Sequence, residues 1–162
     1  GVGGAAIQLL LARGCHVIAR TSVGTADRVT AFGVHEVSRR GIDRIDDIAE
    51  VDVVADVVGG DEFGPLLDRL RTGGRLVTAG AIAGPVVAID LRRLYLRQRR
   101  IIGSTMHTTD DLAELARIAV DGDVEPQVAE VFPLTQLHAA QRRFVTGDFV
   151  GKLVVLPDHQ GR

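Results

Sequence analysis

Short aliphatic runs alternate along this chain with segments in which apolar residues recur at helical spacing. The clearest run covers residues 51–58 and is typical of a strand buried on both faces. Phe63, Leu66, Leu67 and Leu70 come next at helical spacing, which predicts a helix with one apolar face. The same pattern predicts further strands over residues 15–19, 34–37, 75–79, 101–105, 128–134 and 152–156. It predicts further helices over residues 5–13, 25–32, 91–98, 108–119 and 135–146.

This alternation, with glycines after successive strands, predicts an α/β fold built on a doubly wound parallel sheet. Aromatic residues make up only 4% of the chain, so aliphatic side chains must fill the core, as in parallel sheets covered by helices. In such sheets ligands bind beyond the carboxyl ends of the strands. The glycine-bearing residues 59–60 and 80–84 each come after a predicted strand, and we therefore expect them at the edge of a binding site.

Glycines at positions 1, 3 and 4 open the chain directly before the first predicted helix. In dinucleotide-binding folds a glycine-rich loop comes after a buried strand and leads into a helix whose N-terminal amides receive a pyrophosphate. Here no strand precedes the glycines, and the only methionine is Met106. We therefore expect a piece of a longer enzyme whose sheet lacks its first strand. A tight turn between a helix and a sheet is the alternative interpretation of these glycines.

The turn after the strand at residues 15–19 bears on the choice of nucleotide. Sites selective for NAD place an Asp or Glu there to bind the adenosine 2'-hydroxyl, whereas this chain has no acid before Asp27. A guanidinium group pairs well with phosphate oxygens, so Arg20, Ser22 and Arg28 are candidates to bind a 2'-phosphate. This pattern favours NADP(H) over NAD(H). The alternative is that these are solvated turn residues.

The ends of the later strands suggest where a nicotinamide would lie. Backbone groups of residues 56–60 are expected near its ribose, and the segments 80–82 and 104–106 are expected to line the nicotinamide itself. The alternative is that the glycines here only end strands. No nucleophile and base stand out together, so the sequence predicts a cofactor site without identifying catalytic residues.

Charge and composition exclude several classes of function. A formal net charge of -2 argues against general binding to nucleic acid or to anionic membranes, so the arginines between residues 92 and 100 are interpreted as a solvated face. No apolar run is long enough to cross a bilayer. The single Cys15 cannot form an internal disulfide and fits the reducing cytoplasm. The histidines are scattered, and Cys15 and His16 point to opposite faces of a strand, so no metal site is expected in this chain.

Seven segments together resemble the medium-chain dehydrogenase/reductase superfamily, which includes zinc-type alcohol dehydrogenases and quinone oxidoreductases. The first is Gly-Val-Gly-Gly-Ala-Ala-Ile-Gln-Leu at the start of the chain. The others cover residues 52–60, 73–77, 94–98, 102–106, 131–134 and 151–155. Each segment is modest by itself, whereas their order and spacing are specific, and the resemblance extends over almost the whole chain.

The resemblance implies an enzyme that transfers hydride between NAD(P)H and an alcohol, aldehyde, enone or quinone. Residues 1–125 would be a Rossmann-like cofactor domain, and residues 126–162 would return to a GroES-like catalytic domain, the only part in which zinc would be bound. The strand at 101–105 would form a homodimer. The cofactor-binding residues expected are Gly1, Val2, Gly3, Arg20, Thr21, Ser22, Val58, Gly59, Gly80, Ala81, Ile82, Ser104, Thr105, Met106 and Lys152.

That assignment leads to two further expectations. The isolated chain should have little catalytic activity, because most substrate contacts would lie in the catalytic domain. It should also be marginally stable, since a sheet without its central strand leaves backbone groups unpaired. The alternatives in function are a non-catalytic nucleotide-binding module of the same fold and a methyltransferase, although a methyltransferase would need an acid after the second strand to hold a ribose.

Overall fold

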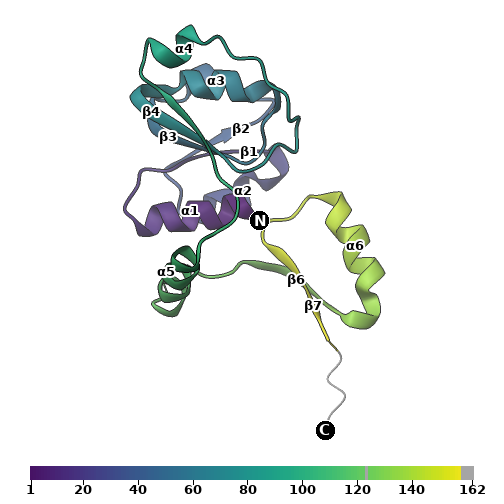
Figure 1. The fold of residues 1–162 in the computed structure, drawn as a ribbon. Helices are drawn as coiled ribbons and strands as arrows, with labels where there is room; N and C mark the ends of the chain where they lie inside the picture. The colour runs from purple at the N-terminus through teal and green to yellow at the C-terminus, as the bar shows by residue number, and fades with distance from the viewer. Residues whose placement is uncertain (123, 158–162) are drawn as a thin grey trace. The chain divides into compact units, whose positions relative to one another are not determined.

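The computed structural model describes residues 1–122 and 124–157. The strands are β1 (Ile18–Thr21), β2 (Glu36–Arg39), β3 (Val51–Asp56), β4 (Leu70–Thr78), β5 (Arg100–Gly103), β6 (Val128–Pro133) and β7 (Lys152–Leu156) (Figure 1). The α-helices are α1 (Val2–Ala12), α2 (Ala26–Thr30), α3 (Phe63–Asp68), α4 (Arg92–Tyr95), α5 (Thr109–Val120) and α6 (Leu137–Thr146). Short 3-10 helices are η1 (Val23–Thr25), η2 (Ile45–Asp47), η3 (Gly60–Glu62) and η4 (Leu134–Gln136).

The chain divides into two compact units. The first unit comprises residues 1–40 and 116–162, and the second comprises residues 41–115. Every strand pairing among the described residues is parallel, which confirms the predicted α/β class. The predicted boundary at residues 125 and 126 concerns membership of domains in a longer enzyme, and it stays a prediction; residues 123 and 158–162 lie outside the described ranges.

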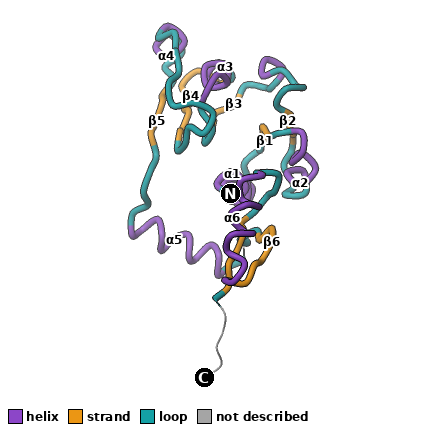
Figure 2. The backbone as a smooth tube through the Cα atoms, turned by 90° about the vertical axis from the view of Figure 1, so that its right-hand side faces the viewer, coloured by secondary structure: helices purple, strands orange, loops and turns teal. Residues whose placement is uncertain are grey.

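In the first unit, β1 and β2 form a two-stranded parallel sheet, with Ile18 opposite Glu36 and Thr21 opposite Arg39. Helix α2 lies alongside this pair and buries Val29 (Figure 2). The unit also contains β6 and β7, which pair in parallel and are connected through η4 and α6. Gly147 ends α6 in the left-handed conformation, with φ of 67°, which glycine adopts at little cost.

The buried hydrophobic cluster Phe63, Leu67, Leu70 and Leu76 lies in the second unit. Strands β3, β4 and β5 form a three-stranded parallel sheet with β4 in the centre. Phe63 and Leu67 of α3 pack with Leu70 and Leu76 of β4, and the three leucines are fully buried. The helical spacing at residues 63–70 thus predicted the apolar face correctly, but the last residue of that series belongs to a strand.

Two local differences from the sequence-based prediction lie in this unit. The helical spacing predicts a helix that includes Leu70, but α3 ends at Asp68, and Gly73 and Gly74 lie within β4. The β3–β4 register shifts between Val51 and Val53, and Gly73 has φ of 79°, so the glycines accommodate an irregularity of the strand. Arg99 is also not solvated: its guanidinium group is buried and donates to the carbonyl oxygens of Asp68 at 3.0 Å and Arg93 at 3.2 Å.

Strand pairing is divided among separate sheets. The doubly wound sheet was predicted to lack its first strand, and the described strands pair in three sheets. Among the described residues β1 pairs only with β2, and β3 only with β4, so each of these two strands has an unpaired edge. No helix in the described ranges has the length and apolar character required to span a membrane.

Candidate functional site

Helix α1 begins at Val2 and therefore includes two of the opening glycines, although the helix was expected to start at residue 5. Gly1 is the N-cap, and no side chain caps this end. The first backbone amides of a helix have no partner within it, and they lie at the positive end of the helix dipole. The first turn of α1 thus presents unpaired donors, which is the arrangement that receives anionic groups such as phosphate.

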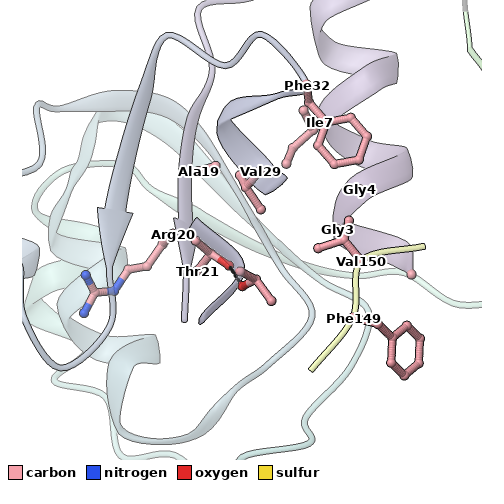
Figure 3. A pocket seen from close by; sticks show the side chains of 12 residues that line it. Gly3, Gly4, Ile7, Ala19, Arg20, Thr21, Val29, Phe32, Phe149 and Val150 are labelled. Carbon is pink, nitrogen blue, oxygen red and sulfur yellow. Dashed lines mark hydrogen bonds between the residues drawn. The ribbon is translucent and has the colours of Figure 1, made fainter. Parts of the chain in front are cut away.

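The three opening glycines have different surroundings. A Cβ atom built on Gly1 or Gly3 would meet no other heavy atom within 4 Å, so both positions border open space. A Cβ atom on Gly4 would lie 3.3 Å from Cζ of Phe32, and Figure 3 shows the Phe32 ring facing this helix beside Ile7. Gly4 therefore allows an aromatic ring to pack closely, whereas Gly1 and Gly3 leave room for a ligand.

Hydroxyl groups gather where β1 ends. Oγ1 of Thr25 lies 2.7 Å from Oγ1 of Thr21 and 2.8 Å from Oγ of Ser22. Arg20 donates to the buried hydroxyl of Ser38 on β2 at 2.7 Å, and in Figure 3 its side chain extends away from α1. No carboxylate side chain lies in the segment from residue 20 to residue 26, as the sequence indicated.

These elements enclose a cavity of about 210 Å³ in the first unit. Its lining includes four of the predicted cofactor residues, Gly1, Gly3, Arg20 and Thr21. Val2 and Ser22 are not in the lining. The remaining walls are Gly4, Ile7, Ala19, Thr25, Val29, Phe32, Phe149 and Val150. The cavity therefore combines polar groups at one end with apolar side chains, as small-molecule sites commonly do.

Phe149 and Val150 were missed by the sequence analysis, because they come from the distant segment between α6 and β7. Arg28 holds this segment: its guanidinium group donates to the carbonyl oxygen of Asp148 at 2.7 Å and to that of Gly24 at 3.2 Å. Arg143 also donates to the Asp148 carboxylate, and its guanidinium carbon lies 5.0 Å from the centre of the Phe149 ring. Arg28 thus holds the residue that precedes Phe149 in the chain, although it was a candidate to bind a 2'-phosphate.

Lys152 lies close enough to the start of α1 to influence it. The pKa of the Gly1 amino group is lowered, first by partial burial and then by the positive charge of Lys152.

A second cavity, of about 500 Å³, lies in the second unit at the carboxyl ends of β4 and β5. It brings together the predicted residues Gly80, Ala81, Ser104 and Thr105. Thr78, Ala79, Pro85 and Gly103 complete its lining. Ile82 and Met106, which were expected here, are 88% and 81% exposed and lie outside the lining.

Val58 and Gly59, expected at a ribose, lie in the turn after β3 and do not line this second cavity. The Asp56 carboxylate accepts hydrogen bonds from both of their backbone amides, at 3.0 and 3.2 Å to Oδ1, and its Oδ2 lies 3.0 Å from the Gly59 amide. These amides are therefore engaged by a side chain of the chain itself, and the carbonyl oxygen of Val58 accepts the Ala83 amide at 2.9 Å.

Metal binding is not supported by the described residues of either unit. Across the described ranges, no three His, Cys, Asp or Glu side chains gather in a way that could hold one. The His16 and His35 rings stack with centroids 4.2 Å apart, and Nδ1 of His35 accepts the Val17 amide at 3.1 Å. By contrast, the cavity beside α1 fits a phosphate group, because the open position at Gly3 adjoins unpaired amides.

Comparison with known proteins gives the family. The family model described as zinc-binding dehydrogenase matches residues 1–121. The chain belongs to the zinc-binding dehydrogenase family. The match confirms the resemblance to medium-chain dehydrogenases/reductases, and it includes both cavities' glycine-bearing segments. Since these described residues do not fit a metal ion, we assign no step to zinc.

Individual proteins similar to this chain carry the names of oxidoreductases. The "Probable quinone oxidoreductase" of Schizosaccharomyces pombe is 27% identical over 96% of this chain and 52% of its own length. A solved structure of a candidate alcohol dehydrogenase from Sinorhizobium meliloti is 44% identical, with a TM-score of 0.91 over 98% of this chain and 46% of that one. The 2-octenoyl-CoA carboxylase reductase CinF, in complex with NADP and 2-octenoyl-CoA, is 29% identical, with a TM-score of 0.88 over 99% of this chain and 42% of that one. The chain thus spans about half the length of the relatives that it matches, and these relatives are oxidoreductases.

Proposed function

We propose that this chain is the cofactor-binding part of an NADP(H)-dependent oxidoreductase. The cavity beside α1 carries the proposal, because it joins unpaired helix amides, open glycine positions and a group of hydroxyls at the end of β1. A diphosphate suits the amides, and the apolar walls formed by Ile7 and Val29 suit the flat surface of an adenine.

The preference for NADP(H) rests on the residues directly after β1. They supply hydroxyls, and the strand itself supplies the Arg20 guanidinium group, but none of them supplies a carboxylate to accept the 2'-hydroxyl of NAD(H). Arg20 is already held by Ser38, so one edge of its guanidinium group is oriented before a phosphate binds. Of the predicted 2'-phosphate ligands we retain Arg20 and Ser22, and we withdraw Arg28 because it contacts the carbonyl oxygens of Gly24 and Asp148.

The cavity of the second unit would hold the nicotinamide against Gly80, Ala81, Ser104 and Thr105. The cofactor supplies the hydride, and this chain binds and orients it while the substrate is held largely by the rest of a longer protein. The substrate would be an alcohol, aldehyde, enone or quinone. An enoyl thioester is the enone favoured by the similarity to the 2-octenoyl-CoA carboxylase reductase.

Nucleotide titration tests the proposed cofactor. We expect the chain to bind NADPH about tenfold more tightly than NADH, since the extra phosphate gains a charge-assisted hydrogen bond. Isothermal titration with NADPH, NADH and S-adenosylmethionine measures this preference and also tests the methyltransferase alternative. Binding of S-adenosylmethionine alone would contradict the proposal.

A non-catalytic nucleotide-binding module is the second candidate, because no catalytic residue is identified in either cavity. We expect the isolated chain to oxidise NADPH no faster than the buffer when benzoquinone, an aldehyde or crotonyl-CoA is added. The same assay on a longer protein that contains this chain separates the enzyme from the non-catalytic module. Turnover there supports the enzyme, nucleotide binding without turnover supports the module, and rapid turnover by the isolated chain would contradict the division of roles.

The proposed partner is a second copy of the chain. Among the described residues β5 pairs only with β4, and the side chains of Ile101 and Ile102 are 37% and 41% exposed. An unpaired strand edge with apolar side chains is well suited to pairing with its twin. The cytoplasm is the proposed location, because the chain has a single cysteine, Cys15, and therefore no internal disulfide.

A further inference from the structure

Two glycine-containing turns lie in direct backbone contact in the second unit. One turn covers residues 57–60 after β3, and the other covers residues 79–84 after β4. Two backbone hydrogen bonds join them: the Ala83 amide donates to Val58 at 2.9 Å, and the Gly60 amide donates to Gly84 at 3.1 Å. Next to them, the Ala79 amide donates to Asp56, the last residue of β3, at 3.0 Å. The second turn includes Gly80 and Ala81, which line the second cavity.

Only backbone atoms and the methyl groups of Ala81 and Ala83 lie against Gly59 and Gly60 at this contact. A Cβ atom on Gly59 would lie 2.8 Å from the carbonyl oxygen of Gly84, and a Cβ atom on Gly80 would lie 2.8 Å from the carbonyl oxygen of Val57. Gly59 also has φ of 66°, which an L side chain rarely adopts. Because backbone rests on backbone, a shift of residues 57–60 must move residues 80–84 as well.

Asp56 is the side chain that holds the first turn. Only 6% of this residue is exposed, and its carboxylate accepts hydrogen bonds from the Val58 and Gly59 amides. A carboxylate that accepts backbone amides forms stronger bonds than a neutral acceptor. It therefore favours the one turn conformation in which both amides point inward, and Gly59 makes that conformation accessible.

We infer that Asp56 is a positioning residue for the nicotinamide end of the site. Its carboxylate fixes residues 57–60, these residues support residues 79–84 through two backbone hydrogen bonds, and Gly80 and Ala81 then form a wall of the second cavity. The inference rests on the proposed function, because it assigns the nicotinamide to this cavity. The role is indirect, since Asp56 itself is not among the residues that line the cavity.

Two probes separate this role from a general effect on folding. NADPH carries a nicotinamide, whereas 2',5'-ADP has only the adenosine phosphates. We expect Asp56→Ala to weaken NADPH binding about tenfold and to change 2',5'-ADP binding less than twofold, because one or two charge-assisted hydrogen bonds are lost at one end of the site only. Asp56→Asn keeps one oxygen acceptor and the same volume, and we expect it to restore most of the NADPH affinity.

Asp52→Ala is the matched control, because Asp52 lies on the same strand but is exposed and pairs with Arg71 at 3.1 Å. It should leave both affinities unchanged. Hydrogen exchange at the Ala83 amide gives a second measurement on Asp56→Ala, in which this amide should exchange faster than in the wild type. An unchanged exchange rate of the Ala83 amide would overturn the positioning role. Equal losses of affinity for NADPH and for 2',5'-ADP would overturn it as well. If the wild-type chain binds neither probe, the proposed function fails instead.

Discussion

Replacing Leu76 by alanine should destabilise the second unit by about 3 kcal/mol. Leu76 is fully buried in β4, the strand that pairs on both sides, and it packs against Phe63, Leu67 and Leu70. Removing its side chain leaves a cavity in a core that has only a few large members, so neighbouring groups have little means of filling it. Urea denaturation followed by circular dichroism measures the change in unfolding free energy.

The control for this prediction is Val86→Ala. Val86 belongs to the same unit, but it is 90% exposed, so its truncation should change stability by less than about 0.5 kcal/mol. A loss below about 1 kcal/mol for Leu76→Ala would show that the cluster around α3 does not stabilise the unit. The expected loss is a large share of the stability of any small domain, and it should therefore unfold much of this unit at physiological temperature.

Replacing Arg20 by aspartate should reverse the nucleotide preference. We expect NADPH binding to weaken about hundredfold, because a charge-assisted contact is exchanged for repulsion between two anions. NADH binding should improve severalfold, since the new carboxylate lies at the end of β1, where NAD sites place the acid that accepts the 2'-hydroxyl. Fluorescence titration with both reduced nucleotides measures the two affinities on the same sample.

Two further variants control for side effects. Arg13→Asp makes the same charge change on an exposed arginine at the other end of α1, and it should leave the ratio of the two affinities unchanged. Arg20→Lys retains the charge but loses the planar pair of donors, so we expect an intermediate preference for NADPH. Equal weakening of NADPH and NADH by Arg20→Asp would mean that Arg20 supports the strand pair through Ser38 and does not contact the 2'-phosphate.

Much of the fold could be predicted from local sequence patterns. The series at Phe63 and Leu67 identified the apolar face of α3, and residues 152–156 were assigned as a strand with the bounds found for β7. The helix predicted over residues 108–119 corresponds to α5, and the Thr108 hydroxyl before its start accepts the Asp111 amide at 3.1 Å. Gly80 and Ser104 were expected together because parallel strands end at one edge of a sheet, and both line the second cavity.

Contacts between distant residues account for the features that the sequence did not show. Phe149 reaches the first cavity because Arg28 holds the segment that carries it, and the two residues are far apart in the chain. Arg99 appeared to be one of several surface arginines, yet it is buried by carbonyl groups of α3 and α4 that only the folded chain assembles. Asp56 was expected to offer its backbone to a ribose, and nothing local indicated that its carboxylate would occupy the amides of Val58 and Gly59.

Parallel pairing of the described strands has a consequence for how the chain folds. Adjacent strands that run in the same direction cannot be joined by a tight hairpin, so each pair forms only after an intervening segment has crossed back along the sheet. These sheet contacts are therefore distant in sequence, and loop-closure entropy must be overcome before any pairing stabilises the chain. Folding is consequently expected to be slow for a protein of this size. Strand edges stay exposed for longer during that time, which makes aggregation a competitor of folding.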